Sequence, residues 1–256
     1  MTNVLAIAQK ELRSYFASPI AYIVIGMWAL LYGYFYASLL QFFVRQSMQM
    51  SQFGQQQPVN INEQMIRLLF QNVTILVLFL MPGITMRSYS EEKRSGTIEL
   101  LLTSPVTDWQ IILGKFFGAL ALYAVMLAVT LIHIGVLFVY GEPEWKPIAT
   151  GYLGLLLMGG SFLSLGLFIS SLTKNQIVAG MVTFAVFLMF WVISWAGSVS
   201  SGGWVTDVTS YLSIIDHFDD FAKGVIDTKH LIYYISFISF GLYLTAKSVD
   251  TERWRG

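Results

Sequence analysis

Long hydrophobic runs alternate with short polar segments along the whole chain of 256 residues. A helix needs about 20 apolar residues to cross the roughly 30 Å hydrocarbon layer of a membrane, and six runs meet that requirement. They cover residues 19–40, 68–86, 116–140, 148–172, 177–197 and 231–249. The pattern therefore predicts an all-α membrane protein in which six transmembrane helices form a single transmembrane domain over residues 1–256.

An amphipathic pattern precedes the first hydrophobic run. In residues 1–18, one face of a helix would carry Val4, Ile7, Ala8, Leu12 and Phe16, and the other face would carry Gln9, Lys10 and Arg13. Such a helix is expected to lie along the membrane surface. The alternative is that these residues extend the first spanning helix, which Pro19 disfavours but does not exclude.

The charged side chains predict how the helices are oriented. If the amino terminus is cytoplasmic, the inner segments contain Lys10, Arg13, Arg87, Lys93, Arg94, Lys115, Lys174, Lys247, Arg253 and Arg255. The outer segments then hold Arg45, Arg67, Lys146, Lys223 and Lys229. Because basic residues concentrate in cytoplasmic loops, we expect both termini in the cytoplasm. The glutamine-rich segment 41–67 is expected to be an outer loop.

Small residues recur in the fourth hydrophobic run. Gly160 with Ser164, and Gly166 with Ser170, are spaced four positions apart. This spacing lets two helix backbones approach closely. The partner helix could belong to the same chain or to a second copy, and we expect it to belong to the same chain.

Composition and the absence of known motifs exclude several classes of function. Only 12% of the residues are charged, against about 25% in soluble proteins. Lys+Arg and Asp+Glu balance at 15 each, which gives no sign of a nucleic-acid partner. The chain has no cysteine, no phosphate-binding G-x-x-x-x-G-K-[ST] and no H-E-x-x-H motif. We therefore expect no catalytic residue and no cofactor bound by this chain.

A charged segment, residues 88–110, separates the second and third hydrophobic runs. It begins with the charged group Glu91, Glu92, Lys93 and Arg94, which can extend the second helix into water. Gly96 suits the end of that helix, and Thr97 can begin a short helix that ends before Pro105. Thr107 and Gln110 predict a capping box at the start of the next long helix.

The short helix would present Ile98, Leu101 and Leu102 on one face. Burying each of these side chains is worth on the order of 1.5–3 kcal/mol, so the face should be covered. Lipid headgroups could cover it, and so could a groove on a cytoplasmic protein. The periodicity alone leaves both possibilities open.

A second polar segment, residues 198–230, is expected on the outer side. It contains Asp216, His217, Asp219 and Asp220 within five positions. Such a group could bind a divalent cation, but we expect the caps and wet ends of short helices and no metal site. Gly224 and Asp227 suit a turn between two such helices.

Two of these segments resemble a known family. The string SEEKRSGTIELLLTSPVTDWQIILGKF, residues 90–116, resembles the cytoplasmic segment of ABC-2 type transporter permeases. The stretch IDHFDDFAKGVID, residues 215–227, resembles the region before the last span in permeases related to gliding-motility ABC transporters. The resemblance covers nearly the whole chain, and the long ordered string is its most specific part.

The resemblance implies the permease subunit of an exporter, with the ABC-2 (type V exporter-like) fold. A separate cytoplasmic ATPase would bind ATP and Mg²⁺. The segment 88–110 would form the coupling helix that docks on this ATPase, with Gly96, Thr97, Ile98, Glu99, Leu100, Leu101, Leu102, Ser104 and Pro105 in the helix itself and the charged group Glu91 to Arg94 as its approach.

The resemblance also implies further partners and a location. A second permease copy or a related permease would complete the transport path, and an auxiliary extracytoplasmic subunit could join. Residues 198–230 would form a re-entrant hairpin in the outer leaflet, and the location would be the bacterial inner membrane.

Two other function classes stay open on the sequence. An ATP-independent transporter or channel would be expected to carry ionisable residues in mid-membrane, and the hydrophobic runs contain almost none. A scaffold would anchor a cytoplasmic complex without transport. No residue identifies a substrate.

Overall fold

The computed structural model describes residues 2–52, 60–98, 105–199, 203–204, 209 and 211–253. Within these ranges all the regular secondary structure is helical, and there is no strand. Five stretches are long and apolar enough to cross a membrane: Pro19–Met50, Asn62–Ser95, Asp108–Tyr140, Trp145–Ser171 and Gln176–Ile193. The predicted all-α membrane fold is confirmed at this level.

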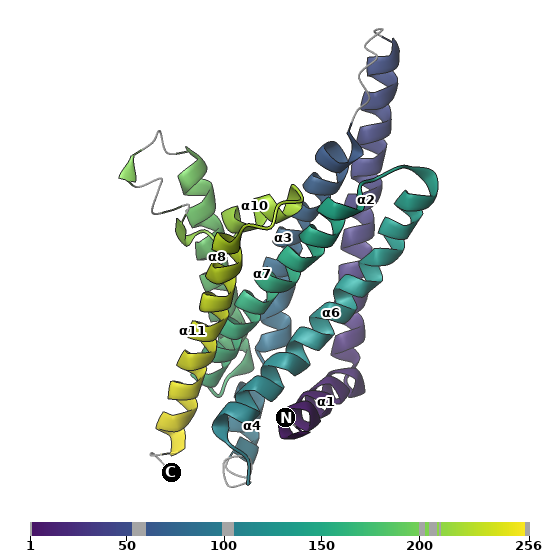
Figure 1. The fold of residues 1–256 in the computed structure, drawn as a ribbon. Helices are drawn as coiled ribbons and strands as arrows, with labels where there is room; N and C mark the ends of the chain where they lie inside the picture. Colours follow the sequence, from purple (N-terminus) through teal and green to yellow (C-terminus); the bar gives the residue numbers. More distant parts are fainter. Residues whose placement is uncertain are drawn as a thin grey trace.

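The helices form a bundle of long, roughly aligned rods with shorter helices at both ends (Figure 1). In chain order they are α1 (Thr2–Ala17), α2 (Pro19–Gln52), the π-helical turn η1 (Asn62–Ile66), α3 (Arg67–Thr85), α4 (Ser90–Ser95), α6 (Asp108–Tyr140), α7 (Trp145–Ser171), α8 (Gln176–Val199), α10 (Asp216–Ala222) and α11 (Thr228–Arg253). Helices α1, α4 and the end of α11 lie at one end of the bundle, and α10 lies toward the opposite end.

The sixth predicted span forms a helix, α11, that packs beside α7. It is not among the five stretches that are apolar enough to count as spans in the described part of the chain. Tyrosines and serines such as Tyr233, Tyr234 and Ser236, together with Lys247, lower its hydropathy. A sixth span therefore stays a prediction.

The first long helix extends well beyond the predicted span. Helix α2 continues through Leu40 to Gln52, so the prediction of a loop beginning at residue 41 is wrong for this part. Residues 41–52 contain neither glycine nor proline, and their Gln, Met and Arg residues are good helix formers. Nothing in this stretch stops the helix. The glutamine-rich residues 53–59 lie outside the described part of the chain.

Helix α1 is separated from α2 by a bend at Ser18, so the alternative of one continuous helix is wrong. The predicted apolar face is partly buried, and Gln9, Lys10 and Arg13 are exposed. Part of the buried face rests on α6, where Gly114 lies against Ile7 and Gly118 lies against Glu11. The absence of side chains at these two glycines permits the close approach.

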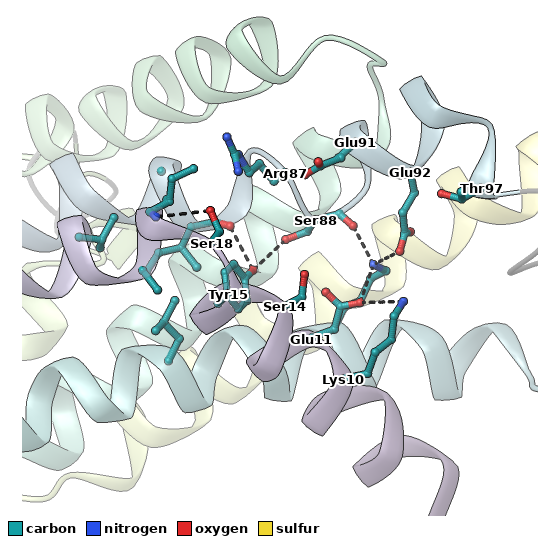
Figure 2. A pocket seen from close by; sticks show the side chains of 17 residues that line it. Lys10, Glu11, Ser14, Tyr15, Ser18, Arg87, Ser88, Glu91, Glu92 and Thr97 are labelled. Atoms are coloured by element: carbon teal, nitrogen blue, oxygen red, sulfur yellow. Dashed lines mark hydrogen bonds and ion pairs between the residues drawn. The ribbon is translucent and has the colours of Figure 1, made fainter.

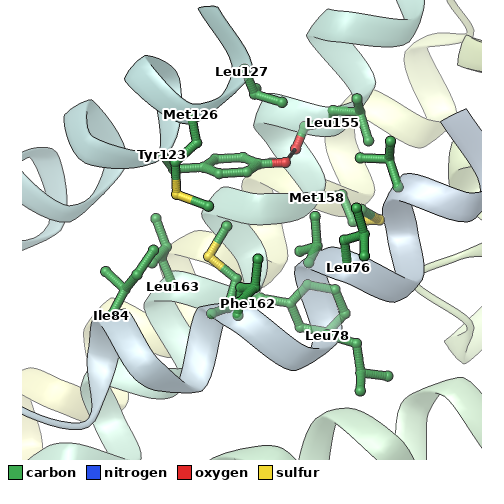
Figure 3. Packing of buried hydrophobic residues seen from close by; sticks show 14 of the residues in the cluster. Leu76, Leu78, Ile84, Tyr123, Met126, Leu127, Leu155, Met158, Phe162 and Leu163 are labelled. Atoms are coloured by element: carbon green, nitrogen blue, oxygen red, sulfur yellow. Dashed lines mark hydrogen bonds between the residues drawn. The ribbon is translucent and has the colours of Figure 1, made fainter. Parts of the chain in front are cut away.

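Helix α7 is the central packing element, and its glycines meet helices of the same chain. A Cβ added at Gly151 would lie 2.3 Å from Phe70 of α3, and one added at Gly159 would lie 2.1 Å from Tyr123 of α6. The Tyr123 hydroxyl donates a 3.0 Å hydrogen bond to the Leu155 carbonyl (Figure 3). The predicted pairs also meet helices of the same chain, because Gly166 lies against Thr85 of α3 and Ser164 lies against Gly241 of α11, as predicted.

Candidate functional site

The charged segment between α3 and α6 has the predicted boundary signals. Helix α4 ends at Gly96, whose φ of 72° lies in the left-handed region that favours glycine. Helix α6 begins with the predicted capping box, in which the Thr107 hydroxyl accepts from the Gln110 amide and the Gln110 side chain accepts from the Thr107 amide. The end of α4 and the start of α6 are therefore each defined by a specific backbone conformation or hydrogen bond.

The prediction that the charged group extends the second helix is wrong. A turn at residues 86–89 separates α3 from a new helix, α4, which carries the charged group. The Ser170 hydroxyl of α7 accepts hydrogen bonds from the Tyr89 and Ser90 amides, at 3.1 and 3.2 Å. These amides therefore have an acceptor on another helix at the point where α3 has ended. The sequence could not show this contact, because Ser170 is about 80 residues away.

Lys115 of α6 lies just beyond the charged segment, and its side chain is only 2% exposed. Its Nζ donates to Glu92 Oε1 at 2.7 Å, Glu11 Oε1 at 3.1 Å and the Ser88 carbonyl at 2.8 Å. The Glu11 and Glu92 side chains converge from α1 and α4 (Figure 2). We call these four residues the Lys115 network. A buried cation with three acceptors holds α1, α4, α6 and the end of α3 in one arrangement.

A second buried cation ties α4 to the last helix. Lys93 Nζ lies 2.6 Å from Glu252 Oε1 of α11, and the Lys93 side chain is 3% exposed whereas that of Glu252 is 38% exposed. Two of the four predicted approach residues, Glu92 and Lys93, thus bind the chain's own helices. Glu91 and Arg94 face solvent and are the two that remain available to a partner.

The predicted coupling helix is only partly visible. Gly96, Thr97 and Pro105 are exposed, and the Thr97 hydroxyl lies 2.9 Å from that of Ser95. Ile98 is 9% exposed and packs with the core. The remaining predicted residues, Glu99, Leu100, Leu101, Leu102 and Ser104, lie outside the described residues. Docking by this segment stays a prediction.

Sequence reasoning missed the role of Glu11. It lies between Ala8 and Leu12, which belong to the apolar face of the helix, and a lone acid on such a face is a signal that it has a buried partner. Nearby, the Tyr15 hydroxyl donates to the Ile84 carbonyl at 3.2 Å. Burial raises the pKa of Tyr15 to about 12, so its hydroxyl stays protonated and keeps this bond between α1 and α3.

The second predicted group lies at the opposite end of the bundle, on and around α10. Asp219 receives two hydrogen bonds from Arg67 Nη2, at 2.8 and 2.9 Å, and one from Gln71 at 3.1 Å. Burial raises the pKa of Asp219, but hydrogen bonds from Lys223 and Arg67 outweigh burial and hold that pKa below its ordinary value. The carboxylate therefore fixes α10 to the start of α3.

The other members of this group form a chain of polar contacts. His217 Nδ1 lies 2.6 Å from His230 Nδ1, and His230 Nε2 lies 2.9 Å from Asp220. His217 Nε2 carries the hydrogen that reaches the Tyr211 carbonyl, because a carbonyl only accepts. Among the described residues, no group of three His, Cys, Asp or Glu side chains is arranged to hold a metal ion.

The predicted turn follows α10. Gly224 has a φ of 92°, which a residue with a side chain rarely adopts, and its position against Pro147 leaves little space. The Asp227 side chain accepts from the Lys229 amide at 2.9 Å at the start of α11. Both residues serve the turn between two helices, as predicted.

Acid is expected to weaken this end of the protein. Burial, together with the nearby His230 and Lys229, lowers the pKa of His217 below its ordinary 6.5. The unfolded chain then takes up a proton before the folded chain does, so stability falls as pH drops through 6.5, by at most about 1.4 kcal/mol per pH unit. Melting temperatures between pH 7.5 and 5.5 should fall less in His217→Gln than in the wild type; equal slopes would contradict the assignment.

Comparison with known proteins confirms the resemblance to ABC-2 type transporter permeases. Residues 5–244 match the family described as ABC-2 family transporter protein. The chain therefore belongs to the ABC-2 transporter family. Together with five apolar helices, this makes it a multi-pass membrane protein. Membership of the gliding-motility branch stays a prediction.

Two curated relatives carry the name "Probable multidrug ABC transporter permease YbhR", one from Escherichia coli (strain K12) and one from Escherichia coli O157:H7. Each is 34% identical over 146 residues, which is 56% of this chain and 38% of the relative. The match thus spans well under half the length of these relatives.

Proposed function

We propose that this chain is the membrane permease subunit of an ATP-driven ABC-2 exporter, and that residues 88–110 couple it to a separate ATPase. The Lys115 network carries the proposal, since it connects the charged segment to α1 and α6 through one buried side chain. A surface loop that merely joined two spans would not need a buried cation shared between helices.

The proposed coupling runs through the contacts of α4. A displacement of this helix acts on α1 and α6 through Glu92 and Lys115, and on α11 through Lys93 and Glu252. These contacts are short and largely shielded from water, so the connected helices are expected to move together. Such an arrangement converts a force on one short segment into movement of several spans.

The docking surface itself is proposed from two kinds of residue. Leu101 and Leu102 would be the apolar anchors in a groove of the ATPase, and the exposed Glu91 and Arg94 would orient the contact. ATP and Mg²⁺ would bind on the ATPase, because this chain has no phosphate-binding loop. The permease itself would not be an enzyme.

The proposed orientation places both termini and the charged segment in the cytoplasm. Helices α1, α4 and the end of α11 lie at one end of the bundle, which is the end where basic residues gather (Figure 1). A second permease copy or a related permease would complete the path, and the bacterial inner membrane would be the location. An auxiliary extracytoplasmic subunit would contact the opposite end, near α10.

The docking proposal is tested by co-expressing the chain with its ATPase and purifying the complex. Leu101→Asp combined with Leu102→Asp should reduce the co-purified ATPase by about tenfold or more, because two charges would enter an apolar groove. Leu172→Asp is the matched control, since Leu172 is 60% exposed in the described structure and follows α7 at the same end of the bundle. Wild-type recovery of ATPase with the double variant would show that the docking assignment is wrong.

A further inference from the structure

A cavity of about 500 Å³ lies between α1, the start of α2, the end of α3 and α4 (Figure 2). One wall is polar and includes Lys10, Ser18 and Arg87. The other wall is apolar and includes Ile20, Val24 and Ile84. The Lys115 network borders the cavity and commits Lys115 to Glu11 and Glu92, although Glu92 Oε2 is buried without a hydrogen-bond partner.

Arg87 also lines the cavity, and it is a cation that takes no part in the Lys115 network. Its Nε is buried without a hydrogen-bond partner. Among the described residues, no carboxylate lies within ion-pair distance of its guanidinium, although Glu91 also lines the cavity. A buried donor without an acceptor is costly, so the Arg87 Nε has a hydrogen bond that a bound anion could accept.

The start of α2 adds a second positive feature to the same wall. This helix has 34 residues and begins at Pro19, and its first turn lines the cavity through Ile20 and Ala21. The Ser18 hydroxyl accepts from the Ile20 amide at 3.4 Å, whereas the amides that follow have no acceptor within the helix. A long helix carries partial positive charge at this end, which favours an anion there.

The apolar wall shows what kind of anion fits. Ile20, Val24 and Ile84 continue from the polar wall toward the membrane-spanning parts of α2 and α3. A Cβ added at Gly83, between these walls, would meet nothing within 4 Å, so the cavity is open at this point. The amphipathic helix α1 indicates that this depth is the membrane–water boundary.

We propose that the cavity binds the phosphate group of an anionic phospholipid, with Arg87 and the first amides of α2 contacting the phosphate and the apolar wall contacting the acyl chain. A phosphate could also come from solution, but free phosphate has no part that would cover Ile20, Val24 and Ile84. The proposal uses no residue of the coupling helix and does not depend on ATPase docking.

The test uses the full chain purified in detergent and stripped of lipid. Binding is measured by native mass spectrometry with phosphatidylglycerol, with zwitterionic phosphatidylcholine and with inorganic phosphate as a competitor. Arg87→Gln removes the cation, and Gly83→Leu fills the open part of the cavity. The matched controls are Arg13→Gln, an exposed arginine of α1, and Gly26→Leu, an exposed glycine of α2 with nothing within 4 Å of a Cβ.

We expect phosphatidylglycerol to bind more tightly than phosphatidylcholine, and each of the two cavity variants to weaken it by about tenfold, the effect of losing one charge-assisted hydrogen bond. The controls should match the wild type. Equal binding of both lipids, or equal losses in Arg87→Gln and Arg13→Gln, would overturn the site. Displacement of the lipid by inorganic phosphate at equal concentration would overturn the lipid as the source. If Arg87→Gln does not fold, Gly83→Leu decides the outcome.

Discussion

Replacing Lys115 by methionine is expected to lower the free energy of unfolding by about 3–5 kcal/mol, the usual cost of removing one partner from a buried ion pair. The side chains of Glu11 and Glu92 are only 13% and 17% exposed, so Glu92 would lose its cation while largely shielded from water, and Glu11 would keep only Lys10, at 3.8 Å. The Ser88 carbonyl would lose its donor as well. Denaturation of the purified protein in detergent measures the loss.

Lys93→Met is the matched control for this prediction. Lys93 is as buried as Lys115, but its partner Glu252 is 38% exposed and can be hydrated when the lysine is lost. The loss should therefore be smaller than for Lys115→Met. Adding Glu11→Gln and Glu92→Gln to Lys115→Met should recover part of the stability, since the buried carboxylates disappear. Equal losses for the two lysine variants would contradict the account of the Lys115 network.

Gly159→Ala is expected to cost about 1–3 kcal/mol of stability, although alanine is normally the better helix former. The added Cβ would lie 2.1 Å from Tyr123 Cε1, so α6 and α7 would have to separate or the ring would have to move. The ring is held by the hydrogen bond from its hydroxyl to the Leu155 carbonyl. Movement of the ring would therefore break a buried hydrogen bond.

Gly135→Ala on α6 provides the comparison, since a Cβ there would meet nothing within 4 Å. This variant should be as stable as the wild type or more stable, by up to about 1 kcal/mol from helix propensity. Thermal denaturation of both variants in the same detergent separates packing from propensity. A Gly159→Ala protein as stable as Gly135→Ala would show that the helices are not in close contact at this glycine.

Much of the fold could be predicted because a membrane helix is specified by a local property, a run of apolar residues. Helix ends were predictable where one residue type has a particular conformational role, as Gly96 does at a left-handed position and Thr107 does in a capping box. The long continuation of α2 was not predicted, because a glutamine-rich stretch reads as a polar loop by composition although nothing in residues 41–52 stops a helix.

The candidate site was less predictable, because its important contacts join distant residues. Glu11 and Lys115 are separated by 104 positions, and the hydrophobic pattern does not determine which residues of α1 lie opposite which residues of α6. The sequence predicts that the whole charged group at residues 91–94 is available to a partner. In the structure Glu92 and Lys93 pack against the bundle, whereas Glu91 and Arg94 are exposed. Periodicity over so short a stretch does not separate the two sides.

The central claim, that the charged segment is reached from the cytoplasm by an ATPase, has a direct test because the chain contains no cysteine. Ser95→Cys would place a single thiol at an exposed position of α4. A membrane-impermeant maleimide should label it in inside-out vesicles and not in intact cells, and bound ATPase should protect it. Labelling in intact cells, with none in inside-out vesicles, would contradict the account.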